Sequence, residues 1–451
     1  MKKLRTYLEK PLTAVDLILF AFFGILCFLS FEQGGDLSHT GISSFAYLKG
    51  HFFDFYDYNK AIVIENNYLP STYILYAIWN LPIHLFGLIN ETTLKVPLLA
   101  LYWFKLLPTL AYFASAFLVY KISILIGLKT LISKCAAYAF LTMPIGFFSQ
   151  FVFGQYDIFT VFFMLIGLYY YYKKNNLMFA VFMSLAMTFK YFPFLIFMPL
   201  LMLVEKNVFK IIKYSIILML PLLLEVLIYL PSQAFRTGIF GFGATNYMFY
   251  ASFDLTIVSI RIVVMLWILL STYAYFKELS DDFEIIKWSL FLSNLVTFLI
   301  FGLSFWHPQW LLFAVPFWVL GTTLSKKFDI FMIIEFLIMV FFVIFTVNIW
   351  PLNVDQNMLT FGIFKSFIVG DINAGLTMAK LYIFNNLDIL YTVFSSLLLV
   401  YVLFKHPKYQ IEKVEDAEIT GMGWNFLRIR FVLGISFFII PAFYILIKNI
   451  F

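Results

Sequence analysis

Two ionisable residues stand where chemistry at a membrane surface would need them. Asp36 follows the first long apolar stretch, in the run FEQGGDLSH, and Lys190 lies inside the apolar run MTFKYFPF. A carboxylate can take a proton from a hydroxyl group, and an ammonium group can bind a phosphate. Each residue also has a structural interpretation, because Asp36 could cap a helix and the Lys190 side chain could extend to the membrane interface.

Four further polar residues adjoin apolar stretches. Arg236 and Arg261 could each hold two phosphate oxygens, because a guanidinium group presents two parallel donors. Asp157 could bind a hydroxyl group, although an aspartate at a helix start is commonly an N-cap. His307 could donate a hydrogen bond to a ligand, or it could belong to an interfacial belt with the two tryptophans of WHPQW.

The composition decides which elements position these residues. Of 451 residues, 63% are hydrophobic and 12% are charged, and this much apolar surface cannot be hidden in one soluble core. We therefore predict an all-α, polytopic integral membrane protein, with residues 1–451 as a single domain. Apolar stretches near the length of about 20 residues that crosses a bilayer predict about 13 transmembrane helices: 12–31, 97–126, 131–149, 157–172, 177–189, 191–204, 210–230, 255–276, 284–304, 308–324, 328–349, 387–404 and 431–449.

The basic residues orient this map, because cytoplasmic loops carry the excess of Lys and Arg. They are scattered between the predicted spans, which argues against a nucleic-acid partner. We expect the N-terminus in the cytoplasm, 32–96 as a first outer loop with interfacial helices, and 405–430 as a cytoplasmic linker. This map places Lys405, Arg428 and Arg430 in cytoplasmic loops and all the polar candidates on the outer side.

Two assignments are needed to keep this orientation. The segment 73–90 must lie in the interface, because one more crossing would reverse the side of every later loop. The segment 176–203 must form two short helices that turn at Lys190. An ammonium group below the outer surface then needs a partner or a water-filled cavity.

The order of the polar motifs along the chain resembles that of a known protein family. The order Gly35-Asp36, Tyr68-Leu69-Pro70, Gly154-Gln155-Tyr156-Asp157, Lys190 with Pro193, and His307-Pro308-Gln309-Trp310 is similar to the C-type (GT-C) integral membrane glycosyltransferases. The resemblance covers most of residues 1–320. It is greatest to the polyprenyl-phosphate-sugar-dependent branch, which includes mannosyltransferase-like and bacterial cell-envelope enzymes.

The resemblance implies the transfer of one sugar, with inversion, to a hydroxyl of a cell-envelope glycan, lipid or polymer on the outer face of the plasma membrane. Asp36 occupies the place of the family's base, with Asp54, Asp57 and Asp157 as the other acids available. Donor phosphate binding falls to Lys190, Arg236, Arg261 and His307, and sugar or acceptor binding to His39, Tyr68, Gln155, Asp157 and Gln309.

We expect no obligatory metal or other cofactor. Relatives often carry two neighbouring acids in the first loop, whereas here Asp54 and Asp57 come long after Asp36. Two other functions stay open. One is a transporter or flippase for a lipid-linked substrate, and the other is a glycan polymerase or ligase that uses a diphosphate-linked donor.

Overall fold

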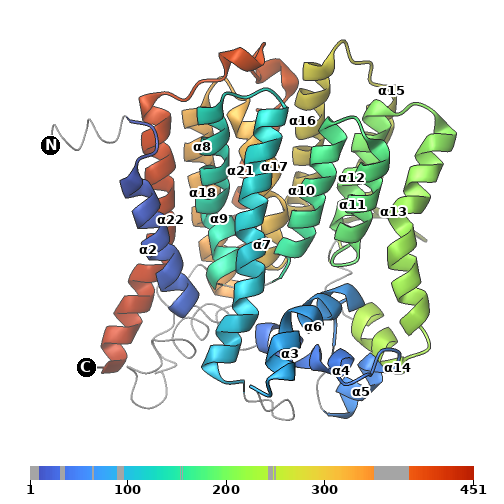
Figure 1. The fold of residues 1–451 in the computed structure, drawn as a ribbon. Helices are drawn as coiled ribbons and strands as arrows, with labels where there is room; N and C mark the ends of the chain where they lie inside the picture. Colours follow the sequence, from blue (N-terminus) through green and yellow to red (C-terminus); the bar gives the residue numbers. More distant parts are fainter. Residues whose placement is uncertain are drawn as a thin grey trace.

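The fold is described from a computed structural model, which defines residues 10–30, 36–62, 66–88, 96–152, 154, 156–241, 247, 250–349 and 385–450. Helices make up most of these residues, which confirms the all-α prediction in outline (Figure 1). Gln155 and most of the outer segment 350–386 lie outside the described residues.

Long helices form one bundle. Neighbouring helices pack along most of it: α10 on α7 and α11, α12 on α15 and α16, and α18 on α21 and α22. The bundle helices are α2 (Ala14–Ser30), α7 (Leu98–Leu125), α8 (Thr130–Thr142), α10 (Ile158–Tyr172), α11 (Asn176–Met187), α12 (Phe192–Val204), α13 (Val208–Tyr229), α15 (Ile262–Phe276), α16 (Asp282–Gly302), α17 (Val315–Thr323), α18 (Phe328–Ile349), α21 (Leu387–Leu403) and α22 (Gly421–Ile450).

Within the described residues, four of these helices are long and apolar enough to cross a membrane by length and composition, and a bent fifth is counted if its two parts form one span. The four are α7, α13, α16 and α18. In the fifth, α8 is followed after a 49° bend by α9 (Pro144–Phe147) and the π-helical turn η1 (Phe148–Val152). Several other apolar helices are shorter than a full membrane span, so the expected number of about 13 spans stays a prediction.

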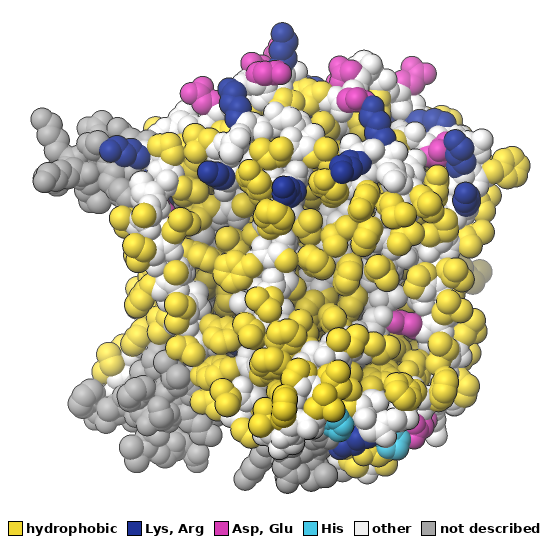
Figure 2. Space-filling model, viewed as in Figure 1, with side chains coloured by type: hydrophobic (Ala, Val, Ile, Leu, Met, Phe, Trp, Pro, Cys, Tyr) yellow, Lys and Arg dark blue, Asp and Glu magenta, His cyan; other side chains and the backbone are white. Residues whose placement is uncertain are grey.

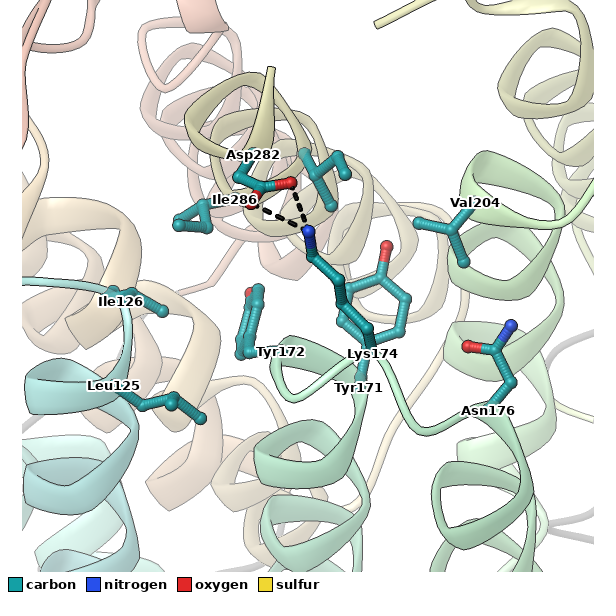
Figure 3. Close-up of a pocket in the computed structure, with 10 residues that line it drawn as sticks. Leu125, Ile126, Tyr171, Tyr172, Lys174, Asn176, Val204, Asp282 and Ile286 are labelled. Carbon is teal, nitrogen blue, oxygen red and sulfur yellow. Dashed lines mark hydrogen bonds and ion pairs between the residues drawn. The ribbon is translucent and has the colours of Figure 1, made fainter.

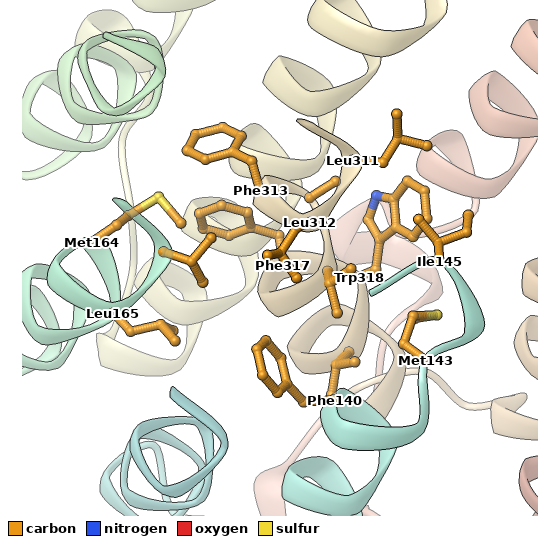
Figure 4. Packing of buried hydrophobic residues seen from close by; sticks show 14 of the residues in the cluster. Phe140, Met143, Ile145, Met164, Leu165, Leu311, Leu312, Phe313, Phe317 and Trp318 are labelled. Atoms are coloured by element: carbon orange, nitrogen blue, oxygen red, sulfur yellow. The ribbon is translucent and has the colours of Figure 1, made fainter. Parts of the chain in front are cut away.

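The core of the bundle is built around α17, in which every residue is buried. Figure 4 shows Phe317 of α17 on the side of Met164 and Leu165 of α10, and Trp318 on the side of Met143 and Ile145. The 3₁₀ turn η4 (Pro308–Phe313) leads directly into α17 and is buried as well. This packing fixes the segment that carries His307, Gln309 and Trp310.

Short helices close one end of the bundle (Figure 1). They are α3 (Asp36–Ser43), α4 (Phe45–Leu48), α5 (Phe55–Ala61), α6 (Pro70–Leu85) and α14 (Gln233–Phe235), and α6 packs against α3 and α4. Aromatic side chains join them to the end of α13, where the Tyr47 and Tyr229 hydroxyls lie 2.9 Å apart. Residues 73–88 therefore belong to this end layer, and their position in a membrane interface stays a prediction.

The break predicted at Lys190 is confirmed. Helix α11 ends at Met187 and α12 begins at Phe192, with Pro193 in the first turn of α12. Proline is tolerated there because the first amide groups of a helix have no intrahelical acceptor. Lys190 is thus held in a short turn between two apolar helices.

Two element boundaries differ from the expectations. The predicted span 255–276 begins as a small antiparallel hairpin, β1 (Ser252–Asp254) and β2 (Ser259–Arg261), and its helix starts only at Ile262. The predicted linker 405–430 ends early, because α22 begins at Gly421 and continues to Ile450. The sequence did not reveal this start because the first part of α22 contains Arg428 and Arg430, which are typical of a loop. Inside the protein these two residues are paired with acidic side chains.

Charged side chains are unevenly distributed between the two ends of the bundle, and the predicted sidedness stays a prediction. Figure 2 shows apolar side chains across the middle of the visible face, with most Lys, Arg, Asp and Glu at its upper edge. That edge is opposite α3–α6 and holds the connection between α21 and α22 (Figure 1). We call it the basic end, and we call the opposite end, which holds α3–α6 and α14, the outer end after the side that the sequence predicts for it.

The sequence map expects Arg428 and Arg430 in a cytoplasmic linker, but both lie within α22, and Lys405 lies just after the end of α21. All three are buried, and Arg428 pairs with Asp16 of α2 at 2.7 Å. Arg430 pairs with Glu335 of α18, so ion pairs join α22 both to α2 near the N-terminus and to α18. Counting positive charges along a sequence cannot reveal such pairing.

The Asp16–Arg428 pair provides a test of this packing. We expect Arg428→Met to lower the free energy of unfolding by about 3–5 kcal/mol, because it leaves a buried carboxylate without its counter-charge. Adding Asp16→Leu should recover part of that loss. Denaturant unfolding in detergent measures both variants.

The exposed Lys326–Glu412 pair, at 2.8 Å, serves as the control. Lys326→Met should change the free energy of unfolding by less than about 1 kcal/mol, because water screens exposed pairs. Equal effects of Arg428→Met and Lys326→Met would contradict the role assigned to α22.

Candidate functional site at the outer end of the bundle

An ion pair between two nearly buried side chains lies at the centre of the site. The Lys190 ammonium nitrogen is 3.3 Å from a carboxylate oxygen of Asp157, and the two side chains are 14% and 8% exposed. Lys190 comes from the α11–α12 turn and Asp157 from the turn before α10. Because α10 and α11 are tightly packed neighbours, their ends bring the two charges together.

Aromatic rings surround the ammonium group of Lys190. Its nitrogen lies 5.2 Å from the centre of the Tyr68 ring and 5.1 Å from that of Trp310. The negative face of an aromatic ring attracts a cation, and the attraction grows when water is excluded. Tyr68 precedes α6 and Trp310 lies in η4, so the end layer and the core segment meet at this side chain.

Asp36 belongs to the same region through the tyrosines. Thr40 of α3 donates a hydrogen bond of 3.1 Å to the Tyr156 hydroxyl, and the Tyr68 and Tyr156 rings are 4.7 Å apart. Burial raises the pKa of Tyr68, and the negative charges of Asp36 and Asp157 raise it further. Both carboxylates are therefore close enough to act on one phenol group.

His307 is the fifth predicted residue that the fold brings here. Its ring stacks with Tyr247 at 6.1 Å and lies 5.1 Å from Trp310. Burial, assisted by the charge of Lys190, lowers the pKa of His307 from 6.5 to about 4. The imidazole is therefore neutral near pH 7 and can both donate and accept a hydrogen bond.

The remaining predicted residues divide into three groups. Gln309 is buried next to Trp310, and His39 lies one turn after Asp36 on α3. Arg236 is exposed and donates to the carbonyl oxygens of Leu230 and Pro231, which accounts for it as a helix-end contact. Arg261 is exposed at the start of α15.

Arg261 and Lys190 nevertheless precede two packed helices, α15 and α12, that begin at the same end of the bundle (Figure 1). The Trp267 indole of α15 donates to the Leu195 carbonyl of α12 at 3.0 Å, and this contact sets the register of two helices that begin at the same end. Arg261 also borders an apolar hollow of about 450 Å³ along α15, lined by Ile260, Val264, Met265, Ile268 and Leu269.

The other acids of the outer loop have structural partners. Asp54 is exposed and lies 2.9 Å from His51, and Asp57 accepts the Ala234 amide at 3.2 Å, which fixes α14 on α5. Both side chains thus take part in contacts within the end layer.

Sequence reasoning missed two residues of this region. Trp310 faces Lys190, although only its interfacial preference was considered. Gln150 lies in the run GFFSQFVF and is fully buried in η1. A polar residue inside an apolar run is the same signal that singled out Lys190, and it could have identified Gln150.

Two of the hollows at the basic end lie beside α10, α12 and α16, away from these residues. One has a volume of about 330 Å³ and is lined by Tyr171, Tyr172 and the exposed Lys174–Asp282 pair, which Figure 3 shows bridging α16 and the α10–α11 turn. The second, of about 680 Å³, is lined by Lys206 and Lys277. The predicted site residues line neither hollow.

Comparisons with protein-family models, curated proteins and solved structures find no match to this chain. Within the described ranges, no three His, Cys, Asp or Glu residues lie together as a metal site would require. The site is therefore interpreted from its own geometry.

The His307 environment gives a pH prediction. Nitrogen NMR of histidine-labelled protein should show no charge change at His307 between pH 5.5 and 8, with His307→Gln used to assign its signal. Because its folded pKa is lower than its unfolded value, the unfolded chain binds the proton first. The free energy of unfolding should thus decrease as the pH drops from 6.5 to 4, and this decrease should be smaller in His307→Gln than in the wild type. A midpoint near pH 6.5 would contradict the burial described for the ring.

Proposed function

We propose that this protein is a glycosyltransferase that moves one sugar from a polyprenyl-phosphate donor to a hydroxyl of a cell-envelope glycan, lipid or polymer. The reaction takes place at the outer end of the bundle, on the extracytoplasmic face of the plasma membrane, and inverts the configuration at the sugar carbon.

The Lys190–Asp157 pair, enclosed by Tyr68 and Trp310, is the observation that carries this proposal. A buried ammonium group is an unusual feature of an apolar bundle, and residues of this kind commonly mark a functional site. A lipid phosphate is an anion that stays at membrane depth, so it matches both the charge and the position of Lys190. The leaving group, a polyprenyl phosphate, also carries less charge than a diphosphate. One or two cations of the protein can neutralise that smaller charge.

The two ends of the reaction would be served by different residues. Asp36 takes the proton of the acceptor hydroxyl while the oxygen of that hydroxyl bonds to the sugar carbon. The bond between that carbon and the phosphate oxygen breaks, and its electron pair leaves with the phosphate. Lys190 stabilises the charge that develops on this oxygen.

Arg261 is the better of the two arginines for a second contact with the phosphate. It begins α15 beside α12 and borders the apolar hollow, whereas Arg236 is engaged with two carbonyl groups. An apolar hollow next to a cation could hold an isoprenoid chain while the cation contacts the attached phosphate.

A transporter for a lipid-linked substrate is the second candidate, and one observation favours it. Lys405 donates to the hydroxyls of Thr322 and Tyr401, and both hydroxyls contact Glu335, which also pairs with Arg430. Charged groups inside a bundle are typical of transport pathways. All three N–H groups of Lys405 donate a hydrogen bond, because the third one donates to the Trp318 carbonyl. This complete pairing favours a structural role.

The transfer reaction is tested with polyprenyl-phosphate sugars and envelope acceptors in membranes that contain the purified protein. We expect turnover with one donor, and Asp36→Asn should lower kcat by about 10²- to 10⁴-fold while donor binding persists, because only proton removal is lost. Asp54→Asn is the matched control in the same outer loop and should retain activity.

Two outcomes would contradict this account. Full activity of Asp36→Asn would place the base elsewhere, with Asp157 as the next acid of the site. Absence of transfer from every donor, combined with protein-dependent movement of lipid across vesicles, would favour the transporter.

A further inference from the structure

Two interruptions of regular helix meet at the outer end. The π-helical turn η1 follows the 49° bend after α8, and the 3₁₀ turn η4 precedes α17. The two turns pack against each other, and the Ser149 hydroxyl donates to the Pro308 carbonyl at 3.3 Å. Interrupted helices inside a membrane bundle commonly mark a functional site, because they present polar groups that a regular helix would hide.

Each interruption carries a buried glutamine whose amide is not satisfied. Gln150 of η1 is 0% exposed, and neither its oxygen nor its nitrogen has a hydrogen-bond partner among the described residues. Gln309 of η4 is 4% exposed, and its amide oxygen also has no partner there. A buried amide without partners destabilises a protein, so an apolar residue would suit these positions better if they served folding alone.

A third polar group completes the set. The Thr160 hydroxyl on α10 is 2% exposed and likewise lacks a partner in the described part of the chain. Thr160 lies three residues after Asp157, which places both on one face of the helix start. Helix α10 packs against η4, as η1 does, so the three unpaired groups come from η4 and the two elements that contact it.

These groups adjoin the Lys190 site through short links. Gln309 precedes Trp310, whose ring faces the Lys190 ammonium, and Thr160 follows Asp157, which pairs with Lys190. Gln150 follows Ser149, which bonds to the residue before Gln309. A ligand whose phosphate contacts Lys190 would therefore have its attached group within reach of these uncharged donors and acceptors.

We propose that Gln150, Gln309 and Thr160 form a subsite that recognises the hydroxyl groups of the donor's sugar, which is an uncharged hexose. This inference rests on the proposed glycosyl transfer and adds to it the residues that select the sugar. A carboxamide both donates and accepts, as does a sugar hydroxyl, so each unpaired atom can be satisfied by one hydroxyl group. The three side chains carry no charge, which matches a neutral sugar.

The test measures binding of two probes to the protein in lipid nanodiscs: a short isoprenyl phosphate without sugar, and the same lipid carrying glucose, mannose or galactose. Gln150→Met should weaken binding of the preferred hexose-bearing probe at least tenfold and change binding of the sugar-free probe less than twofold. Gln309→Met should act in the same direction. The double variant Lys190→Met/Asp157→Asn removes both charges of the pair and should weaken binding of both probes.

Thermal unfolding separates recognition from folding. Gln150→Met should unfold at the same or a higher temperature than the wild type, because it removes an unsatisfied amide. The control is Tyr171→Phe, which removes another buried unpaired hydroxyl at the opposite end of α10, roughly 21 Å from Asp157. It should leave the binding of both probes unchanged.

The outcomes distinguish this inference from the proposed function. If the wild type binds a hexose-bearing probe and Gln150→Met binds it equally well, the subsite is wrong and the transferase stands. A lower unfolding temperature of Gln150→Met would also overturn the subsite, since it would show that folding uses the amide. If the wild type binds neither probe, the proposed function fails and the subsite fails with it.

Discussion

The outer end of this protein depends on one constraint: an ammonium group placed among apolar helices must be neutralised by a nearby charge. Lys190 meets this requirement through Asp157 at 3.3 Å and through the faces of Tyr68 and Trp310. These partners come from the α10 start, the end layer and η4. A single side chain thus joins three parts of the chain that are far apart in sequence, and any change in the helix break at Lys190 would separate them.

Both ends of the bundle contain buried ion pairs and buried polar groups without a partner. At the basic end, Arg428 pairs with Asp16 and Lys405 donates three hydrogen bonds, whereas the Tyr171 hydroxyl and the Arg430 Nε have no partner among the described residues. At the outer end, amide atoms of Gln150 and Gln309 have no partner in that part of the chain. These two amides differ from the others because they lie in two interruptions of regular helix that pack against each other. Unsatisfied groups in a rigid frame are suited to binding a ligand, and the proposed chemistry is therefore assigned to the outer end.

Much of the architecture could be predicted from the sequence because apolar length and positive charge are local signals. The helix break at Lys190 and the end layer containing 73–90 followed from keeping one consistent orientation. The early start of α22 could not be predicted, since Arg428 and Arg430 are exposed residues by type and are buried only because Asp16 and Glu335 lie opposite them. The hairpin before α15 escaped for the opposite reason, because its residues are apolar enough to continue a predicted span.

The candidate site was predicted in part. Asp36, Tyr68, Asp157, Lys190 and His307 were singled out and are brought into one region, whereas Arg236 is accounted for by carbonyl contacts. Gln150 was missed because a lone amide in an apolar run is a weak signal until its surroundings show that nothing satisfies it. Such information depends on the packing of η1 against η4, which no local pattern contains.

The most direct measurement of the central claim is the location of a bound lipid phosphate. A photoreactive isoprenyl phosphate, with its reactive group next to the phosphate, is crosslinked to the protein in nanodiscs, and the modified peptides are identified by mass spectrometry. The account predicts crosslinks to the peptides that contain Tyr68, Lys190 and Trp310, and their loss when unlabelled lipid competes. Crosslinks confined to the peptides around Tyr171, Lys206 and Lys277, which line the hollows of the basic end, would contradict it.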